Sequence, residues 1–99
     1  MGAPIKSPEA AIEAFRAVDT KVQRDARRRG LLSHALYIKL NPPGEESPPE
    51  ILGVDVWCDA AGMHEHYGDT SHMAGLAAVF AGPPKASVWE QAPGDWSEW

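Results

Sequence analysis

The stretch from residue 57 to residue 72 decides the fold. It reads Trp57-Cys58-Asp59-Ala60-Ala61-Gly62-Met63-His64-Glu65-His66-Tyr67-Gly68-Asp69-Thr70-Ser71-His72. An apolar run ends at Trp57, and Asp59 is a residue type that caps the free amides at a helix start. The helix that follows carries Met63, His66 and Tyr67 on neighbouring positions. Because Gly68 to Ser71 interrupts that helix and offers new caps, the stretch predicts a strand, a capped helix and a second helical segment.

A long helix is expected near the start of the chain. Ser7-Pro8-Glu9 combines a capping hydroxyl, a proline suited to the first helical position and an acid at the positive helix end. Gly30 is placed where a left-handed cap would end the helix. The pattern predicts a helix over residues 8 to 29. Its apolar stripe consists of Ala11, Phe15, Val18, Val22 and Ala26.

Two strands should connect this helix to Trp57. Residues 31 to 40 alternate as a half-buried strand does, with Leu32, Leu36, Ile38 and Leu40 sharing a parity with His34. Residues 51 to 57 form a second apolar run, in which Asp55 is the polar exception. The segment between them, residues 41 to 49, contains four prolines and is expected to be an exposed loop.

The last third of the chain predicts a helix and a final strand. Met73, Leu76, Ala77 and Phe80 form an apolar stripe that Gly82-Pro83-Pro84 ends. Residues 86 to 92 are interpreted as a strand with Val88 and Trp89 on opposite faces, and Trp96 and Trp99 are expected to pack on a neighbouring subunit or across a pocket mouth. With Pro4-Ile5-Lys6 as a very short first strand, residues 1–99 form one α+β domain with the ferredoxin-like order βαββαβ.

Composition restricts the function classes. The chain has 99 residues, 43% of them hydrophobic, and a formal net charge of -5. Nucleic acid is disfavoured as a partner, because that binding depends on neutralising phosphates. The basic run from Arg24 to Arg29 suits the negative end of a helix better than an anion site. No apolar run has the roughly 20 residues that span a bilayer. No membrane partner and a cytoplasmic location are therefore expected.

The pattern resembles the antibiotic biosynthesis monooxygenase (ABM-like) family of dimeric α+β barrel proteins. The resemblance is carried by Asp55-Val56-Trp57 at a strand end, by His66 nine residues further and by His72 six residues after that. The break at residues 80 to 84 and the aromatic segment up to Trp89 also fit. The resemblance covers roughly residues 8 to 92.

The resemblance implies a homodimer whose sheets pack face to face, with a ligand cavity between helices and sheet. Activities in the family range from oxygenation of aromatic polyketides without metal or organic cofactor to isomerisation of small molecules. The resemblance therefore implies a small-molecule ligand and no cofactor.

Histidines are the candidate catalytic groups. Pairing Leu40 with Ile51 across the loop would place His34, Asp55 and Trp57 on one face of the sheet. A histidine bonded to a carboxylate is a usable general base near neutral pH. His66 is the other candidate base, and Asp55 would orient it or His34. The simpler interpretations are that His34 is a satisfied core residue and that Asp55 pairs with the backbone.

Four further residues are expected to shape a binding cavity. They are Trp57, Met63, Tyr67 and His72, although Trp57 is equally well explained by core packing. A metal site is disfavoured, because His64 and His66 are two residues apart and point about 200° from each other on a helix. Cys58 has no basic neighbour in sequence, so a reactive thiol is disfavoured as well.

Two hypotheses follow. The first is a cofactor-independent monooxygenase-like enzyme, or an isomerase, that removes a proton from a polyphenolic or enolisable molecule. The second is a dimeric small-molecule-binding or structural protein without catalytic activity. The enzyme is favoured if two of His34, His66 and His72 converge with Asp55 on a closed cavity. It loses its base if all three point to solvent or to the dimer seam.

Overall fold

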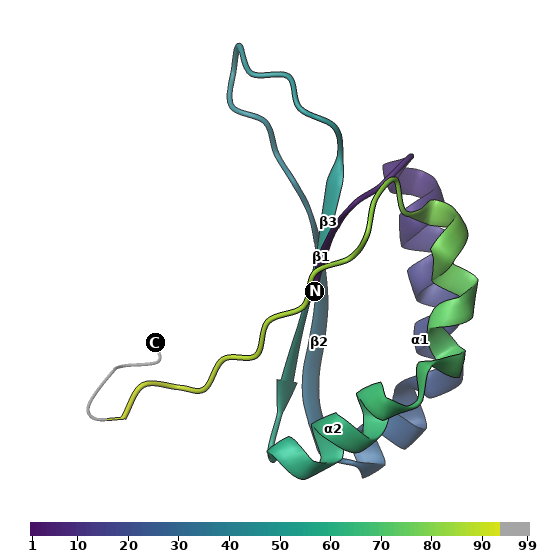
Figure 1. Ribbon diagram of the computed structural model, residues 1–99, viewed down its shortest axis with the longest axis vertical. Coiled ribbons are helices and arrows are strands. Elements are labelled where there is room, and N and C mark those ends of the chain that lie inside the picture. Colours follow the sequence, from purple (N-terminus) through teal and green to yellow (C-terminus); the bar gives the residue numbers. More distant parts are fainter. Residues whose placement is uncertain (94–99) are drawn as a thin grey trace.

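Helices cover one face of a small sheet and leave the other face open (Figure 1). The structure is a computed structural model that describes residues 1–93, apart from the side chains of residues 70, 72 and 73. Along the chain the elements are β1 (Gly2–Pro4), α1 (Pro8–Arg28), β2 (Leu31–Ile38), β3 (Glu50–Trp57), α2 (Ala60–Gly68) and the 3₁₀ helix η1 (Thr70–Val79).

Helix α1 begins and ends where the sequence predicts. The Ser7 side chain accepts a hydrogen bond from the Ala10 N–H, and Pro8 follows in the first turn. At the other end Gly30 has a φ of 112°, a conformation that side chains rarely adopt. The helix buries Ala11, Phe15 and Ala26. A tight end to α1 allows β2 to turn back beneath it.

The three strands form an antiparallel sheet in the order β1-β3-β2. His34 is opposite Asp55, and Ile38 is opposite Ile51. The predicted register was wrong by two residues, but a slip of two keeps each side chain on its face. The molecule is therefore an α+β fold with an open antiparallel sheet, compatible with a ferredoxin-like arrangement.

The core lies between the sheet and the two helices α1 and η1. Phe15 and Phe80 meet edge to face, with ring centroids 6.2 Å apart. Leu76 of η1 is buried, so the second helical segment packs as the sequence predicts, although as a 3₁₀ helix. The buried cluster consists of Ala3, Ile5, Ala11, Phe15, Ile51 and Leu76.

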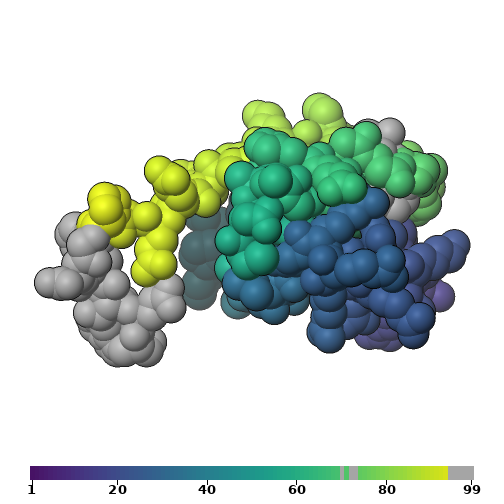
Figure 2. Space-filling model, turned by 90° about the horizontal axis from the view of Figure 1, so that it is seen from below, coloured from purple at the N-terminus to yellow at the C-terminus, as the bar shows by residue number. Residues whose placement is uncertain are grey.

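The predicted final strand, residues 86 to 92, is wrong. Before this segment, residues 80 to 85 lie along β1 and Ile5 through isolated bridges, Ile5 with Phe80 and Gly2 with Lys85, and through the Ala81 N–H, which donates to the Pro4 carbonyl. Pro83 and Pro84 between them have no N–H to donate, which prevents a continuous ladder. Beyond Lys85 the chain leaves the body as an extended arm, with Val88 and Trp89 72% and 87% exposed (Figures 1 and 2). Trp96 and Trp99 lie outside the described residues.

The β2–β3 connection is a projecting loop whose base is held by polar contacts (Figure 1). Lys39 pairs with Glu50 through both backbone and side chain. Further out, the Ser47 hydroxyl donates to the Asn41 side chain at 2.6 Å. Leu40 belongs to this loop rather than to the strand and is 87% exposed.

The outward face of the sheet is apolar and uncovered. Tyr37 is opposite Leu52, and Val54 and Val56 continue the same face, each of the four between 41% and 55% exposed. Leu32 was also expected on the buried face, but the register shift between Leu31 and Ser33 makes it an irregular position, and it is 66% exposed. Among the described residues, no helix is long and apolar enough to cross a membrane.

Candidate functional site

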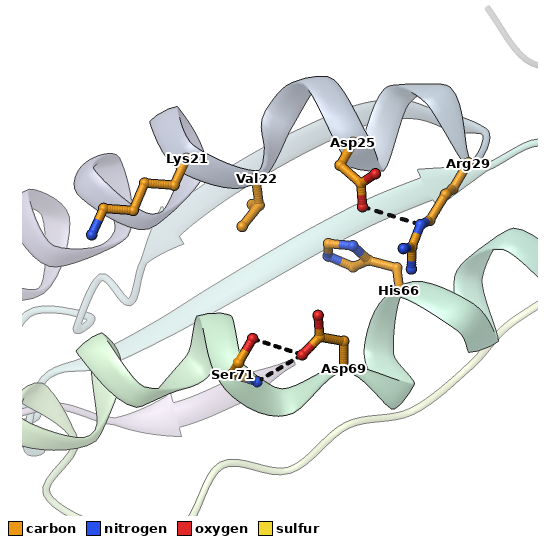
Figure 3. Close-up of a pocket in the computed structure, with 7 residues that line it drawn as sticks. All are labelled: Lys21, Val22, Asp25, Arg29, His66, Asp69 and Ser71. Carbon is orange, nitrogen blue, oxygen red and sulfur yellow. Dashed lines mark hydrogen bonds and ion pairs between the residues drawn. The ribbon is translucent and has the colours of Figure 1, made fainter.

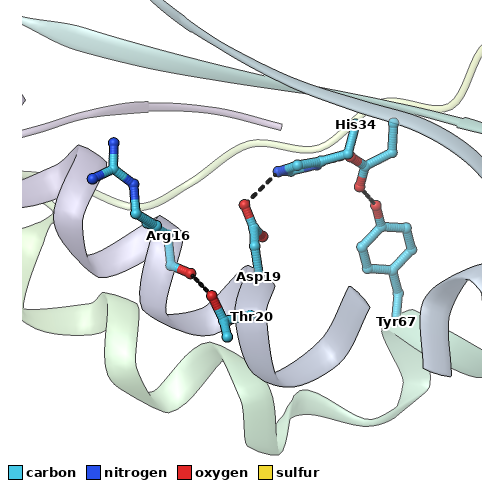
Figure 4. Close-up of polar contacts among 6 residues, drawn as sticks. Arg16, Asp19, Thr20, His34 and Tyr67 are labelled. Carbon is cyan, nitrogen blue, oxygen red and sulfur yellow. Dashed lines mark hydrogen bonds and ion pairs between the residues drawn. The ribbon is translucent and has the colours of Figure 1, made fainter. Parts of the chain in front are cut away.

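Four polar side chains from four elements form one network (Figure 4). His34 of β2 lies between two carboxylates, because its Nε2 is 2.9 Å from Asp19 Oδ2 of α1 and its Nδ1 contacts Asp55 Oδ1 of β3. The Tyr67 hydroxyl of α2 donates to the second Asp55 oxygen. The network, Asp19–His34–Asp55–Tyr67, therefore joins α1 and α2 to the sheet.

Local structure places each member of the network. Register puts His34 directly opposite Asp55 on the face beneath α1. Asp19 is four residues after the core residue Phe15, which directs its side chain toward the sheet. Helix α2 starts at a fixed point, because the Asp59 carboxylate accepts from the Gly62 N–H at 2.7 Å. Tyr67 is carried to the sheet by that helix.

The contacts of His34 favour its imidazolium form. Carboxylate oxygens only accept, so a ring with a carboxylate on each nitrogen donates from both. Burial opposes the charge, but the hydrogen bond and the negative charge of Asp55, followed by those of Asp19, outweigh it and raise the pKa of His34 above its usual value. The two carboxylates therefore favour a ring with protons on both nitrogens.

Tyr67 is held in its neutral form. Desolvation and the bond to the Asp55 carboxylate raise the pKa of the Tyr67 phenol well above its ordinary value. The indole of Trp57 opposes this rise slightly. The two groups do not reach hydrogen-bond geometry, and the buried Trp57 Nε1 has no partner among the described residues. Tyr67 therefore serves as a hydrogen-bond donor that keeps Asp55 in position.

An aromatic cluster extends the network into α2. It consists of Trp57, His66 and Tyr67. The ring centroids of Trp57 and His66 are 5.3 Å apart, and those of His66 and Tyr67 are 5.2 Å apart. His66 is only 8% exposed. The cluster fixes the orientation of the Tyr67 ring, and through it that of Asp55.

Two hollows lie on opposite sides of α1. The larger, about 340 Å³, reaches Asp19 and is called here the α1–β2 groove; its walls are formed by Ile12, Arg16, Asp19, Thr20, Gln23 and Leu36. The smaller, about 210 Å³, lies between α1 and α2 and includes His66 (Figure 3). There Asp25 pairs with Arg29 at 3.1 Å and Asp69 caps Ser71. Asp25, Arg29 and Asp69 of the smaller hollow are already engaged at helix ends, so the α1–β2 groove is the better candidate site.

The structure brings together only some of the residues that the sequence singled out. His34, Asp55 and Tyr67 form the network directly, while Trp57 and His66 support it as ring neighbours. Met63 is buried and lines neither of the two hollows. The side chain of His72 lies outside the described part of the chain.

Sequence reasoning missed Asp19 and Arg16. Asp19 follows Val18 of the apolar stripe, so it lies at the margin of the buried helix face. A carboxylate at that margin is a signal for a buried partner, because an unpaired charge there is unfavourable. Arg16 carries no comparable signal in the sequence.

Comparisons of the chain with protein-family models, with curated proteins and with solved structures gave no significant match. Among the residues whose side chains the structure describes, no group of three or more His, Cys, Asp or Glu is placed to hold a metal ion. Functional inference for this chain therefore depends on the geometry of the network and the groove.

The charge on His34 makes stability depend on pH. Its folded pKa lies above the model-peptide value of 6.5, so its contribution to the free energy of unfolding is complete below about pH 6.5. That contribution is lost as pH rises through the folded pKa. We expect His34→Gln to flatten this decline in urea unfolding measured across the range, while His64→Gln, at an exposed position of α2, keeps it. An unchanged pH profile in His34→Gln would contradict the assignment.

Proposed function

We propose that the protein is a small cofactor-independent, monooxygenase-like enzyme that removes a proton from a polyphenolic or enolisable molecule in the α1–β2 groove. The observation that carries the proposal is the placement of His34, whose Nδ1 is held by Asp55 and whose Nε2 meets a residue of the groove wall, Asp19. An imidazole whose Nδ1 is oriented by a carboxylate becomes a general base at Nε2 once Asp19 releases that nitrogen.

The base forms when His34 loses its Nε2 proton. The Nδ1–H stays on Asp55, while the lone pair on Nε2 then faces the Asp19 carboxylate and repels it. Asp19 moves toward the groove, and a substrate hydroxyl or activated C–H takes its place. The proton passes to Nε2, and the imidazolium stabilises the resulting anion. Because the pKa of His34 is raised, activity should increase with pH through that pKa.

The anion has two possible fates, both compatible with this base. In a monooxygenase the substrate supplies all four electrons that reduce dioxygen: a CH₂ group loses its two hydrogens and becomes C=O, with one oxygen atom entering the substrate and the other leaving as water. In an isomerase it is reprotonated at another carbon. Tyr67 keeps Asp55 in place during either reaction, and Trp57 with His66 holds the Tyr67 ring.

Proton removal can be tested without knowing the natural substrate. Acetylacetone and phloroglucinol exchange their activated hydrogens for deuterium in D₂O, and NMR follows the rate. We expect the protein to accelerate this exchange, with a rate that rises with pH, and His34→Gln to abolish the acceleration. His64→Gln replaces an exposed histidine of α2 and should retain it. Equal exchange with and without protein, for both compounds, would count against the proposal.

A second candidate is a non-catalytic dimeric binding or structural protein. It is favoured because both ring nitrogens of His34 already contact carboxylates. The network also ties α1 and α2 to the sheet, which is a structural role. If His34→Gln lowers the free energy of unfolding and leaves deuterium exchange unchanged, this function replaces the first.

The proposal includes a homodimer of the dimeric α+β barrel type. It is supported by the uncovered sheet face, whose apolar side chains are Tyr37, Leu52, Val54 and Val56. A contiguous apolar patch of this kind marks a protein–protein interface. The exposed arm with Val88 and Trp89 adds apolar surface that a second copy would cover. Two sheets facing each other would then complete the ferredoxin-like domains into one barrel.

The dimer is testable by a charge on the open face. Val54 is paired with Ala35 in the middle of that face, so Val54→Asp would bury a carboxylate in the seam. We expect the wild type to sediment as a dimer and Val54→Asp as a folded monomer. Leu40→Asp places the same charge in the loop, where the side chain is 87% exposed, and should remain dimeric. A monomeric wild type at micromolar concentration would refute the dimer.

A further inference from the structure

One stripe of α1, beside the helix face that covers the sheet, is mostly polar and largely exposed. Ile12, Arg16, Asp19 and Gln23 recur at three- and four-residue intervals, so they lie on one side of the helix. Leu36 of β2 forms the facing wall, and the space between amounts to about 340 Å³. The hollow is open to solvent, with Ile12 and Leu36 as its apolar side chains and Arg16 and Asp19 beside them.

Arg16 is the cation of this stripe without a protein partner. Its guanidinium makes no hydrogen bond or ion pair with any described residue, whereas Arg29 pairs with Asp25 and Lys39 with Glu50. Figure 4 shows Arg16 and Asp19 extending from the same side of α1 toward the strands. The Thr20 hydroxyl donates a hydrogen bond to the backbone carbonyl of Arg16, a contact that does not involve the guanidinium. The parallel N–H groups of the Arg16 guanidinium match the two oxygens of a carboxylate.

We infer that the α1–β2 groove selects substrates that carry a carboxylate, which Arg16 binds. This inference rests on the proposed function and specifies its substrate class as a single-ring phenolic or enolic acid. Arg16 and Asp19 are three residues apart, one helical turn, so a ligand held by Arg16 presents its other end to the His34–Asp19 pair. Ile12 and Leu36 contact the ring between the two ends. Arg16 is thus a specificity-determining residue.

The inference predicts a preference between two ligands of the same shape. The probes are 4-hydroxybenzoate and its neutral counterpart 4-hydroxybenzamide, titrated into ¹⁵N-labelled full-length protein and followed by NMR at the Arg16 Nε–H and the His34 ring. A charge-assisted pair should favour the acid by roughly tenfold. Arg16→Gln should remove that preference. Arg28→Gln removes the same charge from the exposed last turn of α1 and should keep it.

The outcomes separate the inference from the function that it specifies. If both probes shift the His34 ring with equal affinity in wild type and in Arg16→Gln, the carboxylate selection is wrong and the groove remains the site. If neither probe shifts Arg16 or His34, the carboxylate selection and the groove both fail. Arg16 is exposed, so circular dichroism of Arg16→Gln should match the wild type and exclude unfolding as the cause.

Discussion

Replacing Ile51 with alanine should lower the free energy of unfolding by about 2–5 kcal/mol. Ile51 lies on the central strand β3, between Ala3 on β1 and Ile38 on β2, and is only 1% exposed. The substitution removes one methylene and two methyl groups from the buried cluster that packs the sheet against α1 and η1. The whole free energy of unfolding of a native protein is about 5–15 kcal/mol, so the variant should be close to unfolding. Urea denaturation followed by circular dichroism measures the loss.

Leu40→Ala is the control for this change. It removes an aliphatic side chain of the same size from a position that is 87% exposed, and should change stability by less than about 0.5 kcal/mol. A similar loss in both variants would show that Ile51 is not a core residue.

Replacing Gly62 with alanine should destabilise the protein by about 1–3 kcal/mol, although glycine to alanine in a helix usually stabilises by up to about 1 kcal/mol. A Cβ at this position would lie 1.7 Å from the Arg29 carbonyl oxygen. Backbone cannot yield as a flexible side chain does, so α2 must move away from the end of α1. Tyr67 would move with it, and the bond to Asp55 would weaken.

Gly68 provides the matched comparison within the same helix. No heavy atom lies within 4 Å of a Cβ there, so Gly68→Ala should be neutral or stabilising. Urea denaturation should therefore show a loss of stability in Gly62→Ala and no loss in Gly68→Ala. An unchanged stability in Gly62→Ala would mean that α2 does not rest on the end of α1.

Short-range signals predicted most of the helical structure. Ser7-Pro8 and Asp59 cap α1 and α2 as expected, because a cap depends on residues three apart and not on the rest of the fold. The residues that α1 buries, Ala11, Phe15 and Ala26, were likewise predicted from its helical period. By contrast, alternation alone suggested a strand over residues 86 to 92, but a strand also needs a partner edge, which the sequence does not specify.

The site was only partly accessible from the sequence. His34 and Asp55 were placed on one face, and this holds because an even slip in register preserves the face. The proline-rich loop gave no means of fixing the register itself. Asp19 joins the network only because α1 folds back over β2, a contact between residues 15 apart that depends on tertiary packing.

The loop between β2 and β3 offers an attachment point that leaves the chemistry undisturbed. Its base is closed by Lys39 with Glu50 and by Asn41 with Ser47, so the strands do not rely on its tip for their alignment. Gly44 at the tip has a φ of 86° and no heavy atom within 4 Å of a Cβ. Exposed tips of this kind tolerate insertions. An epitope or fluorescent reporter grafted after Gly44 would label the protein while its sheet and histidine network stay intact.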